Sequence, residues 1–372
     1  MNHKFLNLIR YVATERNKRR RIKTIKRRFR SGFPGNVLGK KSQGEAEHKN
    51  YWKEFNHKTH PMFYRAYSHY SKCFSAEFIP DDLFHLYCLP ALNMKDYDAG
   101  YSDHYFVSQL LPEELQCNMV FRNIEEVFYN CNHEKFDVTD KVLHNLLRDH
   151  EEIILKPSLE TDLAKPFLRF RNIHGKFLTK QNELLTVGYL DSHYQKNFIV
   201  ELPPRLHASI MKLDFFNLTA LRFYLYRSPI TEKINLLGCC FIEEKTGFNE
   251  TDMIKDTGIF LVDEEGHIKI FNKRENDKKI RQGLGGNHLP KIPKMSELID
   301  CSKKIAEVNF YHRVIAIDLT LDENEQVKFR GIRNHTFDPV ALQFAGKPFF
   351  GNYTDEIAEF CSREADHKFG EM

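Results

Sequence analysis

The sequence predicts an α+β protein, in which antiparallel sheets carry helices on their faces. Two observations point to this class. From about residue 151 onward, short runs rich in β-branched and aromatic residues alternate with turn residues, which is typical of antiparallel strands. Between 45 and 150, aromatic and apolar residues instead recur at helical spacing. A chain of 372 residues has room for two or three such lobes.

Residues 1–44 are predicted to form a basic arm and a linker. Residues 1–43 carry 14 Lys or Arg and one acidic residue, whereas the remainder carries 41 basic and 50 acidic residues. Apolar residues recur every three or four positions among these charges, which predicts an amphipathic helix before the glycine-rich linker at 31–44. Such a helix can pack on the chain's own acidic body, lie on an anionic membrane surface or bind nucleic acid, and we rank these interpretations in that order.

Residues 45–150 are predicted to be mostly helical. Asp81 and Asp82 suit the first turn of a helix, because acidic side chains stabilise a helix start, and Pro90 suits its end. Thr139 followed by an apolar run predicts another short helix.

Residues 151–360 hold the predicted strands, and residues 361–372 form a tail. Two turns, at 263–266 and 322–324, join successive strands, and 296–308 is a helix. The predicted strands lie in EEIILKPS, FLRF, NFIVEL, ALRFYLY, INLLGCCF, TGIFLVD, HIKIF, HRVIAIDLTLD and QVKFRGIRN.

Four polar residues stand out within or at the ends of these strands. Lys156 ends an apolar strand, where its ammonium needs solvent or a partner such as a phosphate. Asp318 interrupts an apolar strand, which either a Mg²⁺ ion or a salt bridge to a neighbouring strand would explain. Asn334 ends the following strand, so a hairpin would bring it toward Asp318. Arg222 either binds a carboxylate or phosphate of a ligand or makes a structural ion pair.

Short motifs follow one another in a fixed order between residues 51 and 360. They are YW (51–52), IPDDL (79–83), LPALN (89–93), YSD (101–103), FRNI (121–124), ILKPSLET (154–161), NFIVELPPRLH (197–207), LTALRF (218–223), IAIDLTLDENEQV (315–327), Gln343 and GKPFFG (346–351). This order resembles the sugar-transfer-associated ATP-grasp family, whose members occur with genes for surface polysaccharide synthesis.

The resemblance implies an ATP-grasp fold, with two lobes of antiparallel sheet that grip ATP and Mg²⁺. It implies an ATP-dependent ligase that activates a carboxylate as an acyl phosphate for attack by an amine, in cell-surface polysaccharide or glycan biosynthesis. The implied roles are Lys156 and Ser158 for the phosphates, Glu201 for the adenosine end, Arg222 as the catalytic residue at the γ-phosphate or acyl phosphate, and Asp318 and Asn334 for Mg²⁺.

Three departures from the family pattern weaken the expected nucleotide site. Residues 160–166 contain no glycine, although a phosphate cradle needs close backbone N–H groups. A Glu-x-Asn pair of metal ligands is replaced by Ile332 and Asn334, and an Asp-Lys pair is replaced by Asp103 and His104. The alternative hypothesis is therefore a catalytically degenerate ATP-grasp pseudo-enzyme that acts as a binding or scaffold protein in the same pathway. A third is an unrelated adaptor at a membrane surface.

The sequence has no apolar run of membrane-spanning length and no signal-peptide pattern, which predicts a cytoplasmic location. Lipid binding by residues 1–43 would place the protein at the inner face of the membrane. The expected partner is a small-molecule or glycan substrate, and nucleic acid is the least favoured partner.

Overall fold

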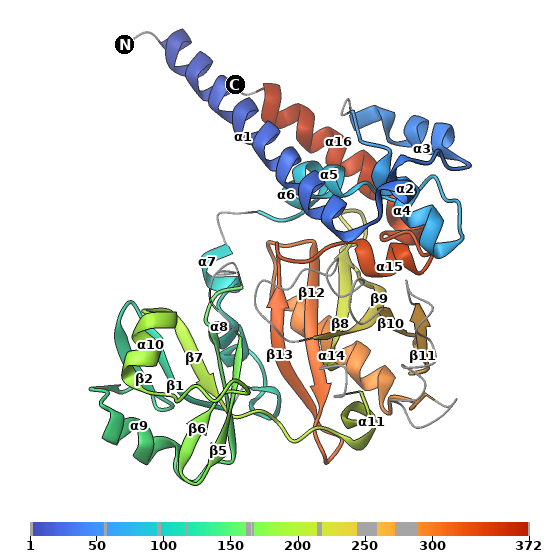
Figure 1. Cartoon of the computed structure of the whole chain (residues 1–372). Coiled ribbons are helices and arrows are strands. Elements are labelled where there is room, and N and C mark those ends of the chain that lie inside the picture. Colours follow the sequence, from blue (N-terminus) through green and yellow to red (C-terminus); the bar gives the residue numbers. More distant parts are fainter. Residues whose placement is uncertain are drawn as a thin grey trace.

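The computed structural model describes residues 3–55, 58–94, 98–116, 118–160, 165, 167–213, 218–243, 259–271 and 289–370. Figure 1 shows two β-sheets next to each other, with a group of helices above the second sheet. Both sheets are antiparallel throughout. The prediction of an α+β protein with two lobes of antiparallel sheet is confirmed.

The first sheet has seven strands in the order β3-β2-β1-β7-β4-β5-β6. Helices α9 (Asp140–Leu147) and α10 (Val187–His193) cover one face of it and close a small apolar core. The side chain of Thr139 caps α9 as predicted, because it accepts the Val142 N–H at 3.3 Å. The strands are β1 (Met119–Ile124), β2 (Val127–Asn130), β3 (Lys135–Phe136), β4 (Glu152–Pro157), β5 (Leu168–Ile173), β6 (Lys176–Leu178) and β7 (Phe198–Glu201).

The helical prediction for 45–150 is wrong at 119–136, where β1, β2 and β3 lie. Ile124 pairs with Val127, so a two-residue turn joins β1 to β2. Both turn residues, Glu125 and Glu126, have positive φ angles of 48° and 71°. Turns of this shape normally use Asn and Gly, so the sequence carried no turn signal there. The first sheet therefore includes strands from both sides of the predicted boundary at 150.

The second sheet has six strands in the order β11-β10-β9-β8-β12-β13. Helix α14 (Met295–Glu307) covers one face, close to the predicted helix at 296–308. The turns predicted at 263–266 and 322–324 join β10 to β11 and β12 to β13. Residues 244–258, between β9 and β10, lie outside the described residues. The strands are β8 (Leu218–Arg227), β9 (Ile234–Glu243), β10 (Ile259–Val262), β11 (Ile268–Phe271), β12 (Val314–Leu321) and β13 (Val327–Arg333).

The other face of the second sheet is covered by the group of helices, which share its largest apolar core. A π-helical turn (Phe84–Cys88) follows α5. The helical conformation continues through Pro90 and does not end there as predicted, because Pro90 lies in the first turn of α6, where no backbone N–H donor is needed. The helices are α1 (His3–Gly32), α2 (Gly35–Gly39), α3 (Glu45–Tyr51), α4 (Met62–Ser71), α5 (Asp81–Leu83), α6 (Leu89–Leu92), α15 (Val340–Phe344) and α16 (Thr354–Gly370).

The C-terminal half of α1 packs on the body of the protein, which is the interpretation ranked first for the basic arm. Phe29 is buried, and its ring centroid lies 4.7 Å from that of Phe63. Ion pairs from α1 reach two acidic residues, with Lys26 at 3.9 Å from Asp82 and Arg28 at 3.4 Å from the Asp338 carboxylate. In the part of the chain that the structure describes, no helix has both the length and the apolar character needed to cross a membrane.

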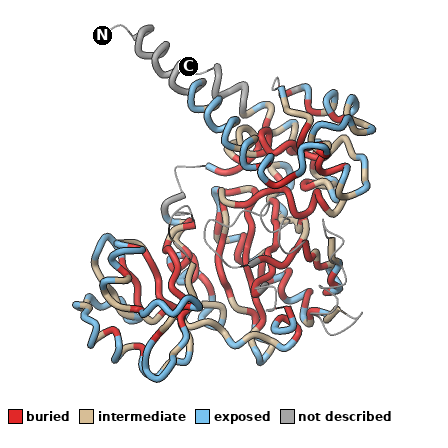
Figure 2. Tube along the Cα trace, in the orientation of Figure 1, coloured by how far each residue is buried: buried red, intermediate tan, exposed pale blue. Residues whose placement is uncertain are grey.

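The short helices α7 (Asp98–Tyr101) and α8 (His104–Gln109) lie between the two sheets (Figure 1). Tyr105 of α8 packs on Met119 and Ile199 of the first sheet, whereas Val107 joins the core of the second sheet. Figure 2 shows that buried residues continue through both sheets and into α8. The space between the lobes is therefore partly filled by the chain's own α8. The remaining helices are η1 (Trp52–Phe55), η4 (Glu113–Leu115), α11 (Ala208–Met211) and η6 (Gly351–Tyr353).

Candidate functional site

Lys156 and Glu201 form a buried ion pair on the face of the first sheet that is turned toward β13. In the register of β4 and β7, Ile154 lies opposite Glu201, so Lys156 and Glu201 are diagonal neighbours. Lys156 Nζ lies 2.8 Å from Glu201 Oε2, and Arg330 Nη1 lies 3.0 Å from Glu201 Oε1. Glu201 is fully buried, so two cations from two different sheets neutralise one carboxylate away from solvent.

Arg222 and Asp318 form a second buried pair, within the second sheet. They lie directly opposite each other on β8 and β12. Arg222 donates two parallel hydrogen bonds to the carboxylate, Nε to Oδ1 at 2.7 Å and Nη2 to Oδ2 at 2.8 Å. Arg333 Nε lies 3.6 Å from Asp318 Oδ2. Of the two explanations for Asp318 in an apolar strand, the structure shows the salt bridge to a neighbouring strand.

His104 lies among the charged residues of both pairs, and its pKa responds to their charges. Burial lowers the pKa of its imidazole well below the usual range, and the charges of Arg333, Lys156, Arg330 and Arg222 lower it further. We call these four cations, with Glu201 and Asp318, the interlobe charge cluster. Four positive charges face two carboxylates in this largely buried place, and the nearby Glu160 carboxyl, whose pKa is raised to about 7, offsets at most one of the two excess charges. Such a surplus favours the binding of an anion.

Glu160 lies next to this cluster and holds the chain that follows β13. Its Oε1 accepts the backbone N–H groups of Asn334 at 2.8 Å and His335 at 3.3 Å, and its Oε2 accepts the Thr336 hydroxyl at 2.8 Å. Burial raises the pKa of Glu160 to about 7, although Arg333 and these hydrogen bonds oppose the rise. Glu160 is therefore a carboxyl group that titrates near neutral pH.

Ser158 follows β4 and is held by its backbone. Its N–H donates to the Asn197 carbonyl at 3.0 Å, and its own carbonyl accepts the His104 N–H at 3.0 Å. The hydroxyl is buried and has no hydrogen-bond partner among the described residues. A buried polar group of this kind is one that a ligand can satisfy. The rest of the glycine-free segment, at 161–164 and 166, lies outside the described residues.

The residues predicted to hold Mg²⁺ do not fit the ion in this arrangement. Both oxygens of Asp318 accept from Arg222, and two guanidinium groups next to the carboxylate would repel a divalent cation. Asn334 Oδ1 accepts the Asn309 amide at 2.9 Å, and Asn334 Nδ2 donates to the Tyr101 carbonyl at 3.0 Å. Mg²⁺ requires oxygen ligands arranged octahedrally around it. The metal role of Asp318 and Asn334 therefore stays a prediction that no contact supports.

The structure pairs the predicted site residues in a way that their spacing did not show. Lys156 contacts Glu201, and Arg222 contacts Asp318. Their roles toward a nucleotide stay predictions. Sequence reasoning missed Arg330. A β-bulge between β12 and β13 leaves this residue without an opposite partner. The sequence signal was weak, because it consisted only of the adjacent Gly331, and a glycine inside a strand can mark a bulge. His104 occupies the space over Gly331, where an added Cβ would lie 3.1 Å from the ring.

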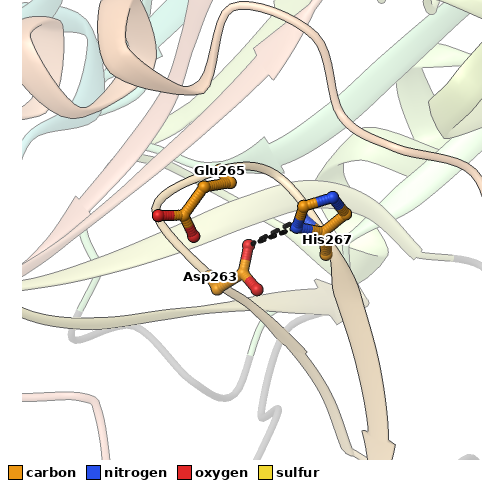
Figure 3. A group of neighbouring side chains, drawn as sticks. All are labelled: Asp263, Glu265 and His267. Atoms are coloured by element: carbon orange, nitrogen blue, oxygen red, sulfur yellow. Dashed lines mark hydrogen bonds and ion pairs between the residues drawn. The ribbon is translucent and has the colours of Figure 1, made fainter.

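Asp263, Glu265 and His267 form a second group of potential ligands, in the exposed turn between β10 and β11 (Figure 3). Asp263 Oδ1 accepts the His267 N–H at 2.8 Å and lies 3.3 Å from its ring nitrogen Nδ1. Lys269 Nζ lies 3.5 Å from the same carboxylate. These contacts explain the group as part of the hairpin turn, and we assign no metal to it.

No protein-family model matches the chain. No curated protein matches it either. Among solved structures, the chain is similar to the D-alanine-D-alanine ligase from Coxiella burnetii, with 12% identity, a TM-score of 0.36, and coverage of 73% of this chain and 60% of that chain. The chain is also similar to D-alanyl-alanine synthetase A from Vibrio cholerae, with 8% identity, a TM-score of 0.38, and coverage of 72% of this chain and 66% of that chain. A third similar structure is N5-carboxyaminoimidazole synthase from Aspergillus clavatus, with 9% identity, a TM-score of 0.35, and coverage of 67% of this chain and 50% of that chain. The chain thus spans less than two thirds of the length of each.

Proposed function

We propose that the protein is an ATP-dependent ligase of the ATP-grasp type, which activates a carboxylate as an acyl phosphate for attack by an amine. The observation that carries the proposal is the interlobe charge cluster, in which four cations and two carboxylates meet between two antiparallel sheets. The negative charge of a triphosphate would balance the surplus positive charge of this cluster. The motif order described above supports the same fold and reaction.

The proposed reaction has two steps. In the first, an oxygen of the substrate carboxylate attacks the γ-phosphorus, the bond from phosphorus to the bridging oxygen breaks, and ADP leaves. In the second, the amine attacks the acyl carbon, phosphate leaves with the bonding electrons, and the amine loses a proton as the amide forms. The protein contributes position and charge neutralisation, because charge builds up on phosphoryl oxygens in both steps.

ATP binding requires the buried ion pairs to exchange partners. Lys156 turns from Glu201 toward the phosphates, and the Ser158 hydroxyl gains an acceptor. Glu201 is then released to accept hydrogen bonds from the adenosine end. Arg222 keeps its position on β8 and presents its guanidinium to the γ-phosphate or the acyl phosphate, which makes it the proposed catalytic residue. The donors present do not fit Mg²⁺, so in this proposal the protein's own cations neutralise the phosphates.

Three observations favour the alternative, a degenerate ATP-grasp protein that binds a partner without catalysis. Every polar group of Asn334 is satisfied within the protein, Arg222 is held by Asp318 through two bonds, and α8 fills part of the space between the sheets. A role in glycan biosynthesis and a membrane contact through residues 1–43 rest on the sequence and are part of the proposal in both versions.

ADP formation distinguishes the two functions. The purified full chain is incubated with ATP, a divalent cation and mixtures of carboxylic acids and amines, including amino acids and sugar acids. ADP formation that depends on an added acid and is lost in Arg222→Lys supports the ligase, because lysine keeps the charge but not the planar fork. ATP binding without ADP formation across these mixtures supports the degenerate protein.

A further inference from the structure

A cavity of about 370 Å³ lies between the basic helix α1 and the body of the protein. Arg20, Arg21 and Arg28 of α1 line one side of it. His85, from the π-helical turn after α5, and residues 335–338, which follow β13, line the other side. Cavities between elements that are distant in the sequence are typical binding sites for small ligands.

The acidic residues of this cavity do not pair with Arg20 or Arg21. Asp338 already accepts from His85 Nε2 at 2.7 Å and lies 3.4 Å from Arg28 Nη2. Burial alone would raise the pKa of Asp338, yet these two contacts bring it below the usual range, so the carboxylate is ionised and engaged. Asp81 accepts the Tyr67 hydroxyl, so its carboxyl group is engaged within the body of the protein, and burial raises the pKa of Asp81 well above the usual range.

Arg20 and Arg21 therefore bring positive charge that the cavity itself does not balance. Among the described residues, neither makes an ion pair with an acid, and Arg21 Nη2 donates to the backbone carbonyl of His85 at 3.3 Å. This bond fixes Arg21 across the cavity and leaves its other donors for a ligand. Both guanidinium groups line the cavity, and each offers a planar fork of donors that matches the oxygens of a phosphate.

Part of the cavity lining is apolar. Phe29 and Phe337 are both buried and line it, and Ile25 adds an aliphatic side chain from α1. A bare phosphate would leave these walls in contact with water. The volume and the mixed lining suit a larger molecule, with one charged group at the arginines and an organic part against the apolar side chains.

We propose that this cavity binds the phosphate group of a phosphorylated organic molecule, held by Arg20 and Arg21, with the organic part on Phe29 and Phe337. The phosphate belongs either to a soluble phosphate ester or to the headgroup of a phospholipid. The site is separate from the interlobe charge cluster and needs no nucleotide there. Thr336 links the two, since it lines the cavity and donates to Glu160.

The test is a calorimetric titration of inorganic pyrophosphate into the full chain without nucleotide. The double variant Arg20→Ala/Arg21→Ala should bind roughly tenfold more weakly or worse. Lys23→Ala/Arg27→Ala is the matched control, because it removes the same charge from exposed positions of α1 that do not line the cavity. Pyrophosphate bound at the interlobe charge cluster is identified as the component of the titration that weakens in Ser158→Ala. The component that depends on Arg20 and Arg21 is assigned to the cavity.

A second arm identifies the source of the phosphate. Sedimentation is measured with phosphatidylcholine vesicles that contain or lack phosphatidic acid. Pyrophosphate binding that depends on Arg20 and Arg21 supports a soluble ligand, and binding only to the phosphatidic acid vesicles, with the same dependence, supports a lipid headgroup. Absence of binding to both probes, or equal weakening in the two double variants, overturns the proposal. Failure of ATP to bind would leave it standing.

Discussion

At the scale of single residues, Arg222 and Asp318 show how a buried charge pair sets the behaviour of the site. Arg222→Met would leave the buried Asp318 carboxylate facing Arg333 at 3.6 Å, so we expect the free energy of unfolding to fall by about 3–5 kcal/mol. Arg222→Met/Asp318→Leu removes both charges, and we expect it to be more stable than Arg222→Met. Urea unfolding of the variants measures this. If the free energy of unfolding lost in the double variant equals the sum of the losses in Arg222→Met and Asp318→Leu, the pairing is contradicted.

Glu160 gives a prediction on pH dependence. Its pKa is about 7 in the folded chain, against an ordinary value of 4.5, so the folded chain keeps a proton that the unfolded chain has lost. The free energy of unfolding therefore falls as the pH rises from about 4.5 to about 7. Glu160→Gln removes this titration and keeps a carbonyl acceptor for the Asn334 and His335 N–H groups. Across this window, the variant should gain up to about 3 kcal/mol relative to the wild type.

The comparison of Glu160→Gln with the wild type cancels other titrating groups. His104, whose pKa is lowered by burial, makes both proteins less stable below about pH 6.5, and this effect is common to the two. Urea unfolding on both sides of the window measures the difference. An identical dependence on pH in the two proteins would show that Glu160 does not titrate there.

The sequence identified some of these residues but not their partners. A lysine at the end of an apolar strand and an aspartate inside another are visible as local conflicts between charge and burial, so Lys156 and Asp318 could be predicted. The partner of Lys156 is Glu201 on the neighbouring strand, and Arg330 reaches the same carboxylate through a β-bulge. Strand pairing is a tertiary feature that no local pattern encodes, and the only local mark of the bulge is Gly331.

At the scale of elements, α8 joins the two sheets and depends on Asp103, the residue that precedes it and caps its N-terminus. Asp103 Oδ1 accepts the N–H groups of Tyr105 at 2.9 Å and Phe106 at 3.0 Å, and its Oδ2 accepts from Arg122 at 2.6 Å. Asp103→Ala should lower the free energy of unfolding by about 1–2 kcal/mol, because it removes the helix cap. Asp103→Asn keeps a carbonyl for the cap and should cost less. Equal losses in chemical denaturation would assign the effect to the Arg122 pair.

Hairpins show why some elements could be predicted and others could not. The turn at 263–266 contains Gly266 with a φ of 86°, where an added Cβ would lie 2.2 Å from the Ile292 carbonyl oxygen, so the sequence marks it clearly. The turn at Glu125 and Glu126 has the same left-handed backbone without glycine. Pairing of β1 with β7 stabilises that hairpin, and a distant strand leaves no trace in the local sequence.

At the scale of the whole molecule, the lobes meet through charge rather than through one continuous apolar core. The apolar core of the first sheet is separate from the two cores that flank the second sheet, and Lys156, Glu201 and Arg330 connect the two sheets. Charged contacts can exchange partners, so an anion can enter where the lobes meet without disrupting either core. The order of motifs along the chain predicted two lobes, but this contact between them was not predictable from it.

The most direct test of the proposed nucleotide site is calorimetry of ATP binding to the full chain and to Ser158→Ala. The Ser158 hydroxyl has no partner among the described residues, so its removal should leave the thermal midpoint unchanged. We predict saturable binding of ATP to the wild type and affinity weakened roughly tenfold in Ser158→Ala, as for a lost hydrogen bond to a charged group. No binding at millimolar ATP, or equal affinity in the two proteins, would contradict a nucleotide site at the interlobe charge cluster.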